Sequence, residues 1–228
     1  MSTVALIHAV QPAMPPMKEV LSEQLPEVKV LNMLDEGLLS EVERFGGLAP
    51  QAVNRLATDV GLAIEAGASA VLLTCNAYTP VVGEIQARFP SVPVMAVDQV
   101  MVDQAVAQAT RIGVLATVPA GLEQQSESLR LAARAAGKPI ELVPSLHPEA
   151  MAALQRGDPE SHDRILLEAL PDLARRVDLV LLAQASMARL ASKVPPDLPV
   201  PVLTSPVLAV EKLRSLLSPG AGARASRG

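Results

Sequence analysis

The chain has 228 residues and a net charge of −5; 50% of its residues are hydrophobic and 19% are charged. This composition is typical of a compact globular enzyme or binding protein and not of a disordered or coiled-coil chain. The length allows one domain or two small ones. Because the sequence pI is about 5.3 and no block of like charge occurs, we expect no nucleic-acid partner.

The sequence also limits location and cofactor content. No apolar stretch approaches the roughly 20 residues that span a bilayer, and the first ten residues, MSTVALIHAV, show neither a basic leader nor a cleavage site. We therefore expect a cytoplasmic protein that does not bind membranes. A single cysteine, Cys75, cannot form an internal disulfide or a thiolate-rich metal site. With no GxGxxG or Walker pattern for a nucleotide, we predict neither metal nor cofactor.

Short β-type runs alternate with helical ones along the chain, which is the pattern of parallel βα units. Several of these runs are apolar on both faces, as expected for strands of a parallel sheet that helices cover on both sides. Between them, apolar residues recur at helical spacing at Val53, Leu56, Ala57, Val60 and Ile64. The predicted strands are residues 4–7, 28–31, 70–74, 92–96, 112–116, 140–143, 179–182 and 200–203.

An internal repeat relates two halves of the chain. The tripeptide VPV begins at 92 and again at 200, an offset of 108 residues, and the same offset lays VALIHAV (4–10) on IGVLATV (112–118) and AVLLTCNA (70–77) on DLVLLAQA (178–185). We predict an α/β protein of two pseudo-symmetric halves, 1–108 and 109–218, with the boundary near 108–110 and a flexible tail at 219–228. Each half is expected to be a three-layer αβα unit with a mostly parallel four-stranded sheet. An exchange of the C-terminal helices between the halves is compatible with this pattern, and the active site is expected in the cleft between them.

The carboxyl ends of several predicted strands share a local pattern, a polar or small residue followed within a few positions by proline. The examples are Gln11-Pro12, Thr79-Pro80, Thr117-Val118-Pro119 and Ser205-Pro206. Proline is favoured at the first helical position and Ser or Thr just before it, so each motif indicates a capped helix start. Ordinary capped helices explain any one motif equally well. Open α/β sheets bind ligands at this edge, however, and several converging helix N-termini favour a site for an anion, most simply a carboxylate.

Cys75 lies at such a strand end, in the stretch VLLTCNAYTP. Cysteine is often a buried core residue, but an amide, Asn76, and a helix start follow here, and a helix dipole with backbone N–H groups can stabilise a thiolate. A reactive and a structural role both remain open. His8 ends the first strand and is a second candidate, although a hydrogen-bonded structural histidine is the more common outcome. Surface or capping roles are expected for three residues of the second half, His147, His162 and Asp163.

The chain has two related α/β halves; TCNA follows a strand of the first half, and RIGVLAT opens the second. With these features the chain resembles the aspartate/glutamate/hydantoin racemase superfamily over nearly its whole length. The resemblance implies cofactor-independent chemistry in which two cysteines, one from each half, face opposite sides of a carbon next to a carboxylate. It implies an acid, base or nucleophile role for Cys75, a place beside the substrate for Asn76, and carboxylate binding for Thr117. The remaining candidate substrate contacts are Ala77, Tyr78, Ser186 and Gln11.

The sequence departs from the family at the second cysteine. The family motif of the type Gly-Cys-Thr corresponds to LLAQASMARL (181–190) and places Gln184 where the cysteine belongs, whereas the offset of 108 pairs Ala183 with Cys75. Neither alignment restores a thiol, which excludes symmetric two-thiol racemisation within one subunit. The Gln184 amide neither gains nor loses a proton near pH 7, but it can donate hydrogen bonds to a carboxylate or enolate. We therefore predict Gln184 as an electrostatic stabiliser and His8 as the second proton-transfer group.

The predicted function is that of a cofactor-independent racemase-family isomerase. It would transfer a proton at the carbon next to the carboxylate of a small molecule, an amino acid or a related acid. A single-cysteine decarboxylase or other lyase is the first alternative, for which the resemblance offers arylmalonate decarboxylase as an example. A non-catalytic carboxylate-binding protein and a hydrolase with Cys75 as nucleophile are further alternatives. The predicted partner is a small-molecule carboxylate, and assembly into a homo-oligomer is compatible with this function.

Overall fold

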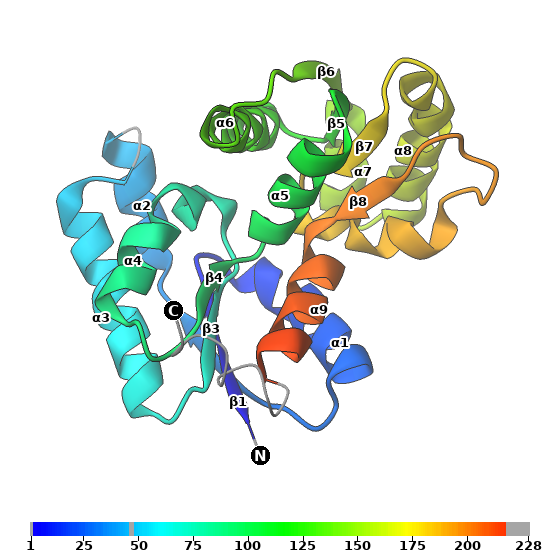
Figure 1. Ribbon diagram of the computed structural model, residues 1–228. Coiled ribbons are helices and arrows are strands. Elements are labelled where there is room, and N and C mark those ends of the chain that lie inside the picture. The colour runs from blue at the N-terminus through cyan, green and yellow to red at the C-terminus, as the bar shows by residue number, and fades with distance from the viewer. Residues whose placement is uncertain (1, 46–47, 218–228) are drawn as a thin grey trace. The chain divides into compact units, whose positions relative to one another are not determined.

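The computed structural model describes residues 2–45 and 48–217, and the chain divides into two compact units, each built around its own sheet (Figure 1). Unit 1 comprises Met1–Gln99 and Ala209–Gly228, and unit 2 comprises Val100–Leu208. The sequence boundary at 108 lies at the end of α5 (Gln99–Gln108), whereas the unit boundary lies at its beginning. Helix α9 (Ser205–Leu217) starts in unit 2 and continues in unit 1. The predicted tail at 219–228 lies outside the described residues.

Unit 1 contains a parallel four-stranded sheet with the strand order β2-β1-β3-β4. Its strands are β1 (Thr3–His8), β2 (Lys29–Leu34), β3 (Ala70–Leu73) and β4 (Val94–Ala96). Its helices, besides α9, are η1 (Gln11–Ala13), α1 (Met14–Gln24), α2 (Glu36–Phe45), α3 (Pro50–Glu65), η2 (Asn76–Val81) and α4 (Val82–Arg88). Helices α2, α3 and α4 cover one face of this sheet, and α1 with α9 covers the other (Figure 1).

Unit 2 repeats this plan with the strand order β6-β5-β7-β8, again all parallel. Its strands are β5 (Arg111–Ala116), β6 (Glu141–Leu146), β7 (Leu179–Leu182) and β8 (Val202–Thr204). Its further helices are α6 (Pro119–Ala135), α7 (Pro148–Gln155), α8 (Pro159–Ala174) and η3 (Ala185–Lys193). Helices α5 and α6 form one apolar core with the sheet, and α7, α8 and η3 form a second core on the opposite face.

The predicted fold class is confirmed. All eight predicted strands are present, each end lying within three residues of the prediction, and both sheets are parallel. The inner strands β3 and β7 are buried along their whole length, because helices cover both faces of each sheet. In the part of the chain that the structure describes, no helix combines the length and apolar character needed to cross a bilayer.

The turn between α3 and β3 sets the position of the strand that carries Cys75. The predicted apolar stripe of α3 is buried against the sheet through Val53, Leu56 and Val60. Gly67 follows with φ = +93°, a left-handed conformation that glycine adopts without steric cost. Backbone bonds from Gly67 N–H to Ile64 O (2.9 Å) and from Ala68 N–H to Ala63 O (3.1 Å) close the helix, and β3 begins two residues later.

The predicted capped helix starts are confirmed only in part. Helices η1, α6 and α9 begin at Gln11, Pro119 and Ser205, but no side-chain hydrogen bond caps η1, η2 or α6. Thr79 and Pro80 lie inside η2, and the Thr79 hydroxyl donates to the buried Asp98 carboxylate at 2.5 Å instead of capping a helix. A buried carboxylate requires such a donor, and this requirement outweighs a cap. Helix α6 does begin at Pro119, but its N-cap residue, Val118, has no side chain that can cap. The side-chain cap of α8 comes instead from Asp158, which accepts from Ser161 N–H.

Candidate functional site

Cys75 lies at the carboxyl edge of the first sheet, two residues beyond the end of β3. It occupies the N-cap position of η2 in an extended conformation, with φ −113° and ψ 125°. Its carbonyl oxygen accepts from Tyr78 N–H at 3.1 Å, and its sulfur accepts a hydrogen bond from Ala77 N–H. The thiol is half-buried and packs against the apolar core of unit 1.

The surroundings of Cys75 favour a protonated thiol. Burial raises the pKa of Cys75 to about 11, the Ala77 N–H lowers it in part, and the negative charge of Asp98 raises it further. A backbone N–H at the start of η2 thus stabilises the thiolate as expected, but burial and the charge of Asp98 outweigh it. The helix that follows is a six-residue 3-10 helix, and its small dipole does not offset desolvation and a nearby carboxylate. At neutral pH the Cys75 thiol is therefore protonated.

We expect slow alkylation of Cys75 by iodoacetamide at pH 7 to 8, because only the thiolate reacts. The rate should rise with pH as the thiol ionises toward its pKa of about 11. The same protein unfolded in denaturant is the control, since its thiol should titrate near the ordinary value of about 8.5. A rate for the folded protein that reaches a plateau below pH 8 would contradict this assignment.

The three residues after Cys75 form the first turn of η2, and each was predicted to contact substrate. Asn76 is half-buried, whereas Ala77 and Tyr78 are buried. The Tyr78 hydroxyl has no hydrogen-bond partner among the described residues. Burial raises the pKa of Tyr78, and the nearby Cys75 and Asp35 raise it further. Roles for these residues in substrate binding stay predictions.

His8 ends β1, and both of its ring nitrogens are engaged within unit 1. Nδ1 lies 2.9 Å from Thr74 Oγ1 and Nε2 lies 3.1 Å from Asn32 Oδ1. The residue is fully buried, and this burial lowers the pKa of His8 although the Asn32 contact raises it in part. His8 is thus neutral at pH 7 and bonded like a structural histidine. Its role in proton transfer stays a prediction, and that role requires His8 to release one of these partners.

Gln184 and Thr117 meet at the carboxyl edge of the second sheet. The Gln184 Oε1 atom accepts from Thr117 N–H at 3.0 Å and from the Thr117 hydroxyl at 3.3 Å. Its Nε2 atom is buried and has no hydrogen-bond partner among the described residues. Since a buried amide N–H is costly when unpaired, Nε2 is an unsatisfied donor at this edge of the sheet. The structure thus brings together two residues that the sequence assigned to one role from distant positions.

The strand registers show which residue of unit 2 corresponds to Cys75. Ile7 of β1 pairs with Leu73 of β3, and Leu115 of β5 pairs with Leu182 of β7. The repeat offset is therefore 108 residues for β1 and β5 but 109 for β3 and β7. Gln184 occupies the N-cap of η3 in an extended conformation (φ −124°, ψ 145°) and corresponds to Cys75 rather than to Asn76. Of the two alignments left open by the sequence, the structure supports the family motif.

Sequence reasoning missed Gly121, which faces Gln184 from the first turn of α6. A Cβ atom at this position would lie 2.2 Å from Gln184 Nε2. The space that the glycine leaves is therefore filled by the amide, and the missing side chain is part of what places Gln184. The signal in the sequence was a glycine early in a helix, a position where glycine has no conformational benefit.

Replacing Gly121 by alanine is expected to push the Gln184 amide away from Thr117 and to lower kcat/KM about tenfold. The fold should persist, because the clash involves the flexible end of a side chain and alanine favours the helix by up to about 1 kcal/mol. Gly83→Ala in α4 is the matched control, since no atom lies within 4 Å of a Cβ there. Equal activity of the two variants would show that Gly121 does not position Gln184.

Gln11 and Ser186 are the other two predicted substrate contacts. Gln11 begins η1 just beyond β1 and is exposed. Ser186 belongs to η3, but its side chain lies outside the described part of the structure. Among the described residues, no group of three or more His, Cys, Asp or Glu side chains is arranged to hold a metal ion.

Comparison with known proteins points to one family. The family model described as Asp/Glu/Hydantoin racemase matches residues 42–213. An aspartate racemase homologue from Pyrococcus horikoshii OT3 aligns with a TM-score of 0.68 and 15% identity over 95% of this chain and 99% of its own. Glutamate racemase from Francisella tularensis, solved with D-glutamate, aligns with a TM-score of 0.65 and 16% identity over 95% of this chain and 80% of its own. Unliganded arylmalonate decarboxylase aligns with a TM-score of 0.58 and 14% identity over 97% of this chain and 95% of its own. Among curated protein sequences, none matches at a significant level.

Proposed function

Because the chain belongs to the Asp/Glu/hydantoin racemase family, we propose that it is a cofactor-independent isomerase that transfers a proton at a carbon next to a carboxylate. The observation that carries the proposal is the equivalence of Cys75 and Gln184 at the ends of β3 and β7. One position supplies a thiol that can carry a proton, and the other supplies an amide that can only donate hydrogen bonds. The proposal requires both residues to act on the same substrate, an amino acid or a related small acid.

In this reaction the carbon loses its proton and its charge spreads onto the carboxylate as an enediolate. The free Gln184 Nε2 donor would stabilise this charge, with its amide held in place by Thr117. Cys75 would return a proton as its S–H bond breaks, and a second group would remove the original one. His8 is our candidate for that group. Because the pKa of Cys75 is raised, the protonation half of the reaction is the one that this thiol serves most readily.

The test uses single enantiomers of amino acids and hydroxy acids, incubated with the protein without added cofactor and analysed by chiral chromatography. We expect at least one class of acid to lose enantiomeric purity at a rate proportional to protein concentration. If every acid in the panel keeps its enantiomeric purity, the isomerase proposal fails.

A decarboxylase is the second candidate, favoured by one observation, a single thiol that stays protonated. In that reaction the bond from the carbon to one carboxylate of a substituted malonate breaks, and its electron pair remains as an enediolate while carbon dioxide leaves. Cys75 then donates its proton to the carbon and regains one from solvent. Release of carbon dioxide with formation of a single product enantiomer would identify this reaction. Racemisation without carbon dioxide release would eliminate it.

A carboxylate-binding protein without catalysis stays the alternative from another class. It predicts that small carboxylates raise the melting temperature of the protein while no turnover occurs. Loss of this shift in a Gln184→Glu variant would place the ligand at the second sheet.

A further inference from the structure

The helix that begins at Gln184 needs support from outside itself. Helix η3 is a 3-10 helix of nine residues, Ala185–Lys193, and such helices are uncommon beyond three or four residues because their hydrogen bonds are poorly aligned. Gln184 lies at its N-cap, and Gln184 O accepts from Met187 N–H at 3.0 Å. The position of the Gln184 amide therefore depends on what holds η3.

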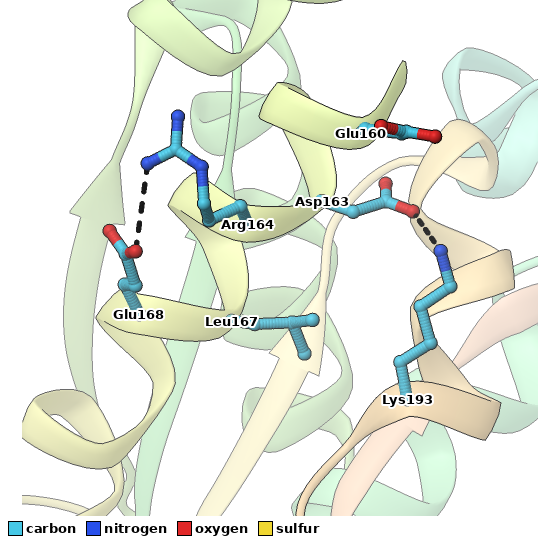
Figure 2. Close-up of a pocket in the computed structure, with 6 residues that line it drawn as sticks. All are labelled: Glu160, Asp163, Arg164, Leu167, Glu168 and Lys193. Carbon is cyan, nitrogen blue, oxygen red and sulfur yellow. Dashed lines mark hydrogen bonds and ion pairs between the residues drawn. The ribbon is translucent and has the colours of Figure 1, made fainter.

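Asp163 on α8 binds two cations of η3, Arg189 and Lys193, and Figure 2 shows its contact with Lys193. Arg189 Nε lies 2.9 Å and 3.1 Å from its two carboxylate oxygens, and Lys193 Nζ lies 2.6 Å from Oδ2. His162 Nδ1 lies 2.8 Å from Oδ1, so the carboxylate contacts groups on three sides. His162 and Asp163 are buried, which corrects the expectation of surface or capping roles for them; His147 does occupy the N-cap of α7.

This carboxylate is charged and buried at the same time. Its side chain is only 6% exposed, and burial alone would raise the pKa of Asp163. The hydrogen bonds from Arg189, Lys193 and His162 overcome burial and bring that pKa to about 2. The attraction between α8 and η3 is therefore present throughout the neutral range. Removal of one cation would leave the buried Asp163 carboxylate partly uncompensated. Each of the two cations is therefore expected to matter for the contact between α8 and η3.

Apolar packing joins the same two helices. Met187 and Leu190 of η3 are fully buried, and they belong to the core cluster that contains Leu166 and Leu170 of α8. These contacts hold η3 against α8. The hydrogen bonds to Asp163 add directional contacts between the same two helices.

We propose that Asp163 is a positioning residue for Gln184, acting through Arg189 and Lys193 to hold η3 against α8. The inference deepens the proposed function and rests on it, since Gln184 is the group whose placement matters there. Asp163 does not touch the substrate. Removal of a residue that orients a functional group without touching the substrate typically lowers activity about 10- to 100-fold.

The pocket beside this cluster provides a matched pair of variants (Figure 2). It has a volume of about 400 Å³ and is lined by Glu160, Asp163, Arg164, Leu167, Glu168 and Lys193. Lys193→Gln removes one of the two cations that bind Asp163. Arg164→Gln removes a cation from the same pocket. Arg164 pairs with Glu168 within α8 at 3.6 Å, and among the described residues no hydrogen bond or ion pair joins it to η3.

Two readouts separate positioning from mere stability. Hydrogen exchange of the amides at 184–193 should become faster in Lys193→Gln and stay unchanged in Arg164→Gln. In the reaction, Lys193→Gln should lower kcat about tenfold with little change in KM, whereas Arg164→Gln should behave as the parent protein. In a Gln184→Glu background, Lys193→Gln should lower kcat little further, because both changes act through the side chain at position 184.

Unchanged hydrogen exchange at 184–193 in Lys193→Gln would overturn the proposal. So would a loss of kcat on adding Lys193→Gln that is as large in the Gln184→Glu background as in the parent protein. Asp163→Asn should produce the same local exchange pattern more strongly. Since hydrogen exchange needs no substrate, the contact between η3 and α8 is tested even if the proposed reaction fails. A failure of the reaction would instead show as turnover that is absent from the parent protein or independent of Cys75.

Discussion

Replacing Cys75 by serine is expected to lower the rate of proton transfer by about 10³-fold or more. A serine hydroxyl can accept the Ala77 N–H bond in the same place, but its proton is far less acidic than that of a thiol and is not transferred to carbon at neutral pH. The measurement is the initial rate on whichever acid the parent protein turns over. No second thiol in the chain can replace Cys75.

The control for this variant is its melting temperature. Cys75 is half-buried and serine is slightly smaller, so the free energy of unfolding should fall by only about 1 kcal/mol. Activity within tenfold of the parent protein in a folded Cys75→Ser variant would mean that the thiol carries no proton in the reaction.

The second large effect is expected for Gln184→Glu, which separates the two ends of one side chain. A carboxylate oxygen still accepts from Thr117 N–H and from the Thr117 hydroxyl, so the loop after β7 should keep its structure. The Nε2 donor is lost, and a negative charge faces the carboxylate of the substrate. We expect kcat/KM to fall about 10²- to 10³-fold, as for the loss of one oxyanion-hole donor.

Gln184→Leu is the companion variant. It removes both ends of the amide and leaves the buried Thr117 N–H without this partner, which should destabilise the fold by about 1 to 3 kcal/mol in addition to the loss of activity. Chemical denaturation distinguishes the two variants. Full activity in Gln184→Glu would show that the Nε2 donor has no part in the reaction.

The sequence was sufficient to predict the architecture because parallel strands covered on both faces have a strong signal. β3 and β7 are uninterrupted apolar runs, and the stripe of α3 has helical spacing, so each segment allows one interpretation. Parallel topology then places the strand ends at the carboxyl edges of the sheets, Cys75 at one edge and Thr117 with Gln184 at the other.

What the sequence could not predict depends on single residues and on distant partners. A repeat offset does not show where one residue has been added. Both Ala183 and Gln184 are therefore candidates in the sequence, and only the registers of β3 and β7 show that Gln184 is the equivalent of Cys75. The pKa of Cys75 depends on burial and on Asp98, which is distant in sequence. The sequence predicts only a local cap for Asp163, because its two partners on η3 lie 26 and 30 residues further along the chain.

The central claim is proton transfer at a carbon next to a carboxylate, and its most direct test is hydrogen exchange into substrate in heavy water. NMR would follow the hydrogen next to the carboxylate in amino acids, hydroxy acids and substituted malonates, with the parent protein and with Cys75→Ser. The account predicts that this hydrogen is replaced by deuterium in at least one class of acid, or that deuterium enters as carbon dioxide leaves, and that Cys75→Ser abolishes both. Acids that bind without incorporating deuterium, or incorporation that persists in Cys75→Ser, would contradict it.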